Sequence, residues 1–197
     1  MNNVTRTPPS YEVICQHYQV MARRLMKDVR HPDGDFCHTV FVEDEVGTDF
    51  AAIEPDIIQG QALKEHFFTV VLPEMLRRCR ARMFGLLMPA WWVPPDKLNT
   101  EEKRALLGEY CDAGGKLADH PDREEIAALT VCDGDRLDTY LANVKRRPGQ
   151  RPRYGPWVQM DTETEGKSCG LMVDDLRTAL QAVRAETEGA DDGALSS

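Results

Sequence analysis

Residues 124–145 read EEIAALTVCDGDRLDTYLANVK, and this stretch decides the fold class. Two segments rich in apolar and β-branched residues flank Asp133-Gly134, the dipeptide that a tight turn between antiparallel strands favours. The pattern therefore predicts a β-hairpin with strands at 124–132 and 136–145. A two-residue turn would place Ile126 opposite Leu141 and Leu129 opposite Asp138.

The segments on either side of this hairpin alternate between helical and strand patterns. Apolar residues at positions 14, 18, 21 and 25 predict a helix from Tyr11 to Val29. Further patterns predict strands at 36–43, 49–58, 83–93 and 156–161, and helices at 62–82 and 171–185. Pro73 predicts a kink in the second helix, and Pro89 predicts that the 83–93 strand is an edge strand or is bulged.

This order of elements indicates an α+β fold. Reading along the chain gives helix, strand, strand, helix, strand, strand, strand and helix, so we expect an antiparallel sheet of about five strands with helices packed on it. We expect a single domain over 10–185 with an insertion at 94–121 that contains a helix at 100–111. Residues 1–9 are predicted to be a flexible arm and 186–197 a disordered acidic tail.

Composition excludes several classes of protein. The 197 residues include 33 acidic and 24 basic side chains, for a formal charge of −9, whereas a protein that wraps duplex DNA is usually basic over its whole domain. The longest apolar run, Met83 to Val93, holds eleven residues, and a transmembrane helix needs about twenty. We therefore expect no membrane span, and MNNVTRTPPS lacks the apolar stretch of a secretory signal.

The six cysteines, at positions 15, 37, 79, 111, 132 and 169, form no CxxC pair. Small secreted disulfide scaffolds are shorter and denser in cysteine. We therefore expect reduced thiols that mostly fill the core of a cytoplasmic protein, with no metal and no cofactor. Cys37 and His38 are adjacent on a predicted strand and point to opposite faces, so they would not share one metal ion.

Charge is segregated along the chain. The segment 31–66 contains nine acids and a single Lys, whereas 145–153 contains five basic residues and no acid. The basic segment is a Pro- and Gly-rich loop, where arginine forks suit phosphate or carboxylate groups and aromatic rings can stack on bases. The candidate binding residues are Arg146, Arg147, Arg151, Arg153, Tyr154 and Trp157, together with Trp92. The alternative is a solvated loop that balances an acidic protein.

A second polar cluster precedes the hairpin. His120, Asp122, Glu124 and Glu125 would suit the general acid–base chemistry of a hydrolase if they met at one end of the sheet, and a turn with solvated charges is the alternative. The sequence has no GxSxG or HExxH motif and no Gly-rich phosphate loop. The adjacent Trp91 and Trp92 point to opposite faces of their strand, so one belongs to the core and the other to a surface or interface.

The order of elements resembles the roadblock and profilin-like architectures, in which helices pack on an antiparallel sheet, and this implies a fold without a function. The sequence AWW at 90–92, then HPDREE at 120–125 and GPW at 155–157, is similar to a pattern in small uncharacterised proteins of phages and prophages. This resemblance spans about residues 83–158. It implies a mobile-element origin, a location in the host cytoplasm or the virion, and no catalytic residues.

These observations favour a non-enzymatic accessory or interaction protein that binds a protein partner or assembles with itself through separated acidic and basic surfaces. The alternative is a protein that binds nucleic acid or a nucleotide through the 145–157 loop. A small hydrolase that needs no metal is the third hypothesis.

Overall fold

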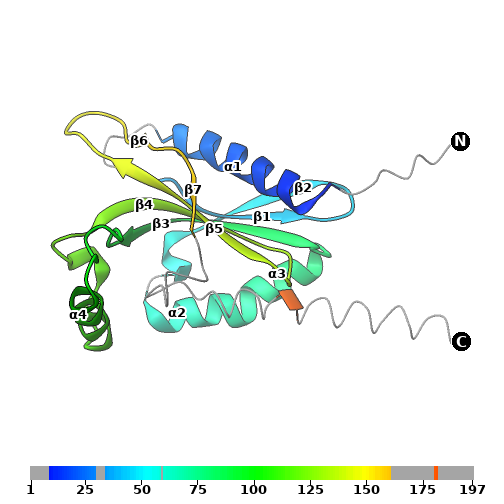
Figure 1. Ribbon diagram of the computed structural model, residues 1–197. Coiled ribbons are helices and arrows are strands. Elements are labelled where there is room, and N and C mark those ends of the chain that lie inside the picture. The colour runs from blue at the N-terminus through cyan, green and yellow to red at the C-terminus, as the bar shows by residue number, and fades with distance from the viewer. Residues whose placement is uncertain (1–8, 30–33, 59, 161–179, 182–197) are drawn as a thin grey trace, which may run out of the picture.

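The computed structural model describes residues 9–29, 34–58, 60–160 and 180–181. Within these ranges an antiparallel sheet of seven strands lies between helices on its two faces (Figure 1). The α+β class is confirmed, with more strands than the five expected. The strands are β1 (His38–Glu43), β2 (Thr48–Ile53), β3 (Met83–Trp92), β4 (Glu124–Cys132), β5 (Leu137–Lys145), β6 (Arg153–Tyr154) and β7 (Val158–Gln159).

The strand order determines which strands form the edges of the sheet. The order is β2-β1-β3-β4-β5-β6, and β7 also pairs with β5. Tyr154 of β6 pairs with Val144 and Val158 of β7 pairs with Leu141, so β6 and β7 together line one side of β5. One edge of the sheet is therefore β2, and the other is the interrupted β6–β7 strand.

Helix α1 (Tyr11–Lys27) covers one face of the sheet. Ser10 caps it, with its hydroxyl accepting a hydrogen bond from the Val13 amide at 3.4 Å, as the sequence predicts. Tyr18 is fully buried beneath the helix and stacks on Phe41 with ring centroids 5.3 Å apart. Gly85 leaves room for that ring, because a Cβ at this position would lie 2.6 Å from Tyr18 Cδ2.

The opposite face is covered by α2 (Gln61–His66), the π-helical turn η2 (Phe67–Val71) and α3 (Leu72–Arg78). They follow the short 3₁₀ turn η1 (Pro55–Ile58), and Phe68, Leu72 and Leu76 pack in the core against the sheet. The predicted helix at 62–82 thus ends earlier and is interrupted. Pro73 has no N–H to donate, and the π-helical turn lies directly before the turn that contains it.

Strand β3 is central and its pairing with β4 is uninterrupted, so the prediction that Pro89 marks an edge or bulged strand is wrong. Its pairing with β1 ends at Leu87, whereas its pairing with β4 continues and places Pro89 opposite Ala127. The proline therefore lies beyond the end of the β1 ladder, where its missing N–H costs no hydrogen bond.

The predicted hairpin is confirmed, but its predicted register is wrong by two residues. Leu129 pairs with Tyr140 and Ile126 with Asn143, because the connection spans four residues instead of two. Asp133 explains the wider turn. Its backbone amide donates to the Arg136 carbonyl at 3.1 Å, and its carboxylate accepts from the amides of Asp135 and Arg136 at 3.1 and 2.7 Å.

Between β3 and β4 lie α4 (Glu101–Asp112), where a helix was predicted at 100–111, and the 3₁₀ turn η3 (Leu117–Asp119). Thr100 caps α4 by accepting from the Lys103 amide at 3.2 Å, and none of the helix residues is buried. Most of the predicted C-terminal helix, the predicted arm and the predicted acidic tail lie outside the described residues. Leu180 is fully buried, and the side-chain Nε2 of Gln181 donates to the Gly134 carbonyl at 2.8 Å.

Candidate functional site

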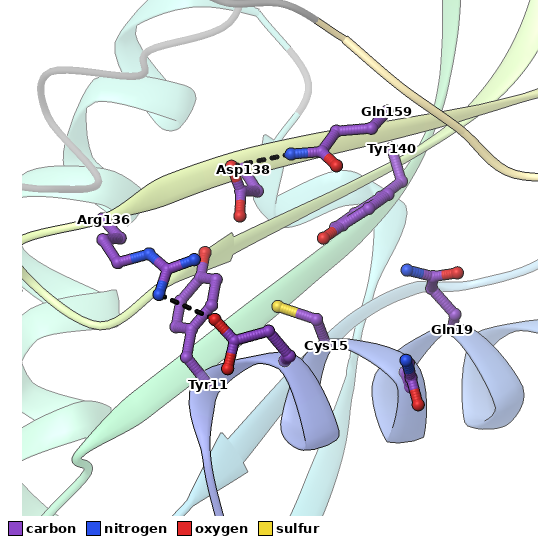
Figure 2. A pocket seen from close by; sticks show the side chains of 9 residues that line it. Tyr11, Cys15, Gln19, Arg136, Asp138, Tyr140 and Gln159 are labelled. Atoms are coloured by element: carbon purple, nitrogen blue, oxygen red, sulfur yellow. Dashed lines mark hydrogen bonds and ion pairs between the residues drawn. The ribbon is translucent and has the colours of Figure 1, made fainter.

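A pocket of about 330 Å³ lies between α1 and the β5 side of the sheet (Figure 2). Arg136 Nη1 donates to Glu12 Oε1 at 3.0 Å, and Gln159 Nε2 donates to Asp138 Oδ1 at 3.1 Å. The polar groups of the pocket therefore largely satisfy one another. Its lining residues are Tyr11, Glu12, Cys15, Gln16 and Gln19 of α1, with Arg136, Asp138, Tyr140 and Gln159 from the sheet side.

Three groups that line this pocket are disfavoured in their charged forms by burial. Burial raises the pKa of the Cys15 thiol, and its hydrogen bonds with the Tyr140 and Tyr11 hydroxyls lower the pKa by a smaller amount. Burial also raises the pKa of Tyr11 and of Tyr140 far above the ordinary phenol value. Thiolates are the reactive form of cysteine, so burial favours the less reactive thiol form of Cys15.

Arg146, the first of the predicted basic binding residues, is held within the fold. Its Nε and Nη2 donate to the two carboxylate oxygens of Glu125 at 2.8 and 2.6 Å, and its Nη1 donates to the Gly34 carbonyl at 3.0 Å. Asp35 also pairs with this guanidinium. The hydrogen bonds that Arg146 donates to Glu125 are the main reason that the pKa of Arg146 is raised. Arg146 therefore links two parts of the same molecule, the segment that precedes β1 and the strand β4.

The other arginines of the loop remain accessible. Arg147 and Arg151 are exposed on the connection between β5 and β6, and Arg153 is exposed at the start of β6. Within the described ranges no ion pair involves any of the three. The structure thus separates the predicted cluster into one cation that is paired within the fold and three cations that are accessible on the surface.

The predicted aromatic residues do not form a stacking surface beside these cations. Trp157 Nε1 donates to the Gln19 carbonyl at 3.3 Å, and the Arg23 guanidinium lies 5.1 Å from its ring centroid. Tyr154 packs edge-on against Phe36 with centroids 6.1 Å apart. Trp92 packs on the apolar cluster around Ile126, whereas its neighbour Trp91 is 40% exposed.

The His120 cluster forms a turn. His120 Nδ1 accepts a hydrogen bond from the Asp122 amide at 3.1 Å, and the ring lies against Tyr110 with centroids 5.5 Å apart. Glu124 instead accepts from Asn143 Nδ2 at 3.3 Å, and Glu125 binds Arg146. Two of the three carboxylates of this cluster, those of Glu124 and Glu125, therefore have partners other than the imidazole.

The β2 edge is an exposed acidic surface within the acidic segment 31–66, although none of its residues was among the predicted binding residues. Asp49, Phe50, Ala51 and Ala52 are all exposed, so neither helical layer covers this strand before Ile53. From Glu43 to Asp56 the chain has six acids and no base. Glu43 and Asp44 form local hydrogen bonds in the turn, whereas the exposed acids of this edge are Glu45, Asp49, Glu54 and Asp56.

In the part of the chain that the structure describes, no three His, Cys, Asp or Glu side chains gather as a metal site would require. No helix in those ranges has the length and apolar character to cross a membrane. Comparison of the chain with family models, curated proteins and solved structures finds no match. Function is therefore inferred from the residues and their geometry.

Proposed function

We propose that this chain is a non-enzymatic interaction protein that binds other protein surfaces, including further copies of itself, through two oppositely charged edges of its sheet. The observation that carries the proposal is the placement of charge. The acidic hairpin β1–β2 and the basic β5–β6 connection belong to opposite edges of the sheet, and Figure 1 shows their turns at opposite ends of the molecule.

This placement favours attraction between molecules over attraction within one. The acidic edge carries Glu45, Asp49, Glu54 and Asp56, all exposed, and the basic connection carries Arg147, Arg151 and Arg153, also exposed. Charges of opposite sign on separate surfaces steer encounters and fix the relative orientation of partners. A basic connection on one copy can thus meet an acidic edge on the next.

The pocket and the His120 turn support a role without catalysis. The Cys15 thiol is buried with a raised pKa, and the His120 imidazole accepts a backbone hydrogen bond. Neither arrangement activates a nucleophile or a general base.

A charge-exchange experiment tests the proposal. One variant carries Arg147→Glu, Arg151→Glu and Arg153→Glu, and the other carries Glu45→Lys, Asp49→Lys and Glu54→Lys. We expect light scattering to detect salt-sensitive self-association in the unchanged protein, and each variant alone should lose it because each brings like charges together. An equimolar mixture should regain association, since the new acidic loop of one variant can meet the new basic edge of the other.

Arg146 is left unchanged in both variants because its removal would leave Glu125, whose side chain is only 12% exposed, without its main partner. Association that survives in each separate variant, or a mixture that stays monomeric, would contradict the proposal.

Binding of nucleic acid is the second candidate, and the three exposed arginines favour it. Titration with a labelled single-stranded oligonucleotide separates the two functions. Salt-sensitive oligonucleotide binding that the three Arg→Glu changes abolish, with no self-association at any salt concentration, would support this candidate in place of the first.

A further inference from the structure

Among the residues that the structure describes, no strand pairs with the outer side of β2, and the backbone of this edge is oriented to accept a further strand. The Asp44 amide donates to the Gly47 carbonyl at 3.0 Å, which closes the hairpin, and the same register pairs Phe41 with Phe50. Hydrogen-bonded and non-hydrogen-bonded pairs alternate along an antiparallel ladder. The backbone groups of Thr48, Phe50 and Ala52 therefore point away from β1.

The hydrogen bond of Phe50 agrees with this assignment. Its amide donates to the carboxylate of the adjacent Asp49 at 2.8 Å instead of to a carbonyl of β1. A side chain that occupies an outward N–H blocks indiscriminate pairing of an edge strand. An incoming segment must therefore draw the Asp49 carboxylate away, and a basic side chain provides the charge to do so.

The two faces of β2 differ in chemistry. Phe50 is 50% exposed and its ring lies 6.4 Å from that of Phe41, so an apolar side chain of an added strand can pack beside it. Asp49 points to the other face because side chains alternate along a strand. A matching segment would thus alternate between apolar and basic residues.

We propose that the open edge of β2 binds an extended segment of a partner protein, with alternating basic and apolar residues, as an additional strand of the sheet. This proposal rests on the proposed interaction function and specifies a class of partner for its acidic edge. Main-chain hydrogen bonds would supply affinity and the alternating side chains specificity, as in other cases of strand addition.

Neither sheet edge of a second copy has this chemistry. Pairing β2 with another β2 would bring two acidic edges together, each with six acids and no base between Glu43 and Asp56. The β6–β7 edge is basic, but Pro152 and Pro156 lack the N–H groups of a continuous ladder and each paired segment has only two residues. Since neither described edge of a second copy fits, we assign the strand-forming occupant to a segment of another protein.

The test uses a labelled short peptide in which Lys and Val alternate, and binding is followed by fluorescence anisotropy. A control peptide has the same sequence but carries N-methyl groups on alternate backbone amides, which removes the donors of one edge and keeps the charge. The full chain should bind the first peptide and lose at least about tenfold in affinity for the control. Equal binding of the two peptides, or no binding of the first, would overturn the proposal.

Two variants, each with a matched control variant, test whether the peptide binds at β2. Ala52→Pro removes an outward N–H without removing a bond of the β1 ladder, and it should weaken peptide binding about tenfold, whereas Ala52→Val keeps the N–H and should retain binding. Asp49→Lys should weaken binding more than Glu102→Lys, which makes the same charge change on the exposed α4. Peptide binding that Ala52→Pro leaves unchanged would refute strand addition.

The fold of each variant is checked by its circular dichroism spectrum and melting temperature. If Ala52→Pro unfolds, a second test uses the unchanged protein. Amide hydrogen exchange is then measured with and without the peptide. Protection at Phe50 and Ala52 supports the proposal, and unchanged exchange there refutes it. Peptide binding combined with failure of the charge-exchange experiment would refute self-assembly and leave the β2 proposal standing.

Discussion

Gly85→Ala should destabilise the fold by overpacking the layer between α1 and the sheet. A Cβ at this position would lie 2.6 Å from Tyr18 Cδ2 and 3.0 Å from Tyr18 Cε2. The ring cannot swing into solvent, because Tyr18 is completely buried and stacks on Phe41. The added methyl group therefore has to displace α1 or distort the sheet.

The expected net loss follows from two opposing effects. Overpacking a close-packed core costs roughly 1–3 kcal/mol, and replacing glycine in a strand by alanine recovers about 0.5–1 kcal/mol of backbone entropy. We expect a net loss near 1–2 kcal/mol in the free energy of unfolding. For a chain of this size each kcal/mol corresponds to about 2–4 °C in melting temperature.

Urea unfolding followed by circular dichroism measures this loss. Gly108→Ala is the matched control, because no heavy atom lies within 4 Å of a Cβ at this position on α4, and that change should be neutral or stabilising. The double variant with Tyr18→Leu tests the cause, since the smaller side chain can turn away from the new methyl group. A Gly85→Ala variant as stable as the unchanged protein, or an equal loss in the Tyr18→Leu background, would refute the reasoning.

Three further predictions concern other parts of the molecule. Burial lowers the pKa of His38 below its ordinary value near 6.5, so the contribution of His38 to the free energy of unfolding is present above that pH and is lost as the pH falls. In urea unfolding, His38→Gln should make the free energy of unfolding depend less on pH between about pH 7 and 5. Parallel pH profiles for the variant and the unchanged protein would contradict this. Gly134 has φ +92°, and Gly134→Val should cost about 1–3 kcal/mol of unfolding free energy, which an unchanged melting temperature would disprove. Iodoacetamide should label the exposed Cys37 and Cys79 of the native protein before the buried Cys15, as peptide mass mapping would show, and early labelling of Cys15 would mean that the α1 layer opens.

Much of the secondary structure could be predicted because its signals are local. The spacing of apolar residues predicts α1, and the Ser10 and Thr100 caps mark the starts of two helices. The turn dipeptide predicts the β4–β5 hairpin, but not its register. The register depends on the Asp133 carboxylate, which accepts two backbone amides and extends the connection to four residues.

The candidate site was predicted less well because its partners are distant in the sequence. Arg147, Arg151 and Arg153 are exposed as expected of a Pro- and Gly-rich loop. Arg146, in contrast, binds Glu125, which lies 21 residues earlier in the chain. Nothing in the basic segment distinguishes this arginine from its neighbours, so only the antiparallel pairing of β4 with β5 separates it from them.

The sequence by itself determined the α+β class, the segregation of charge and the positions of most turns, because periodicity, capping and turn chemistry act between residues close in the chain. Only the tertiary structure decided that Pro89 lies in a central strand, that Trp92 packs in an apolar cluster and that β2 is an open edge. These properties depend on which strands become neighbours. Strand order is set by long-range pairing and by the helices available to cover each face, and no single segment contains that information.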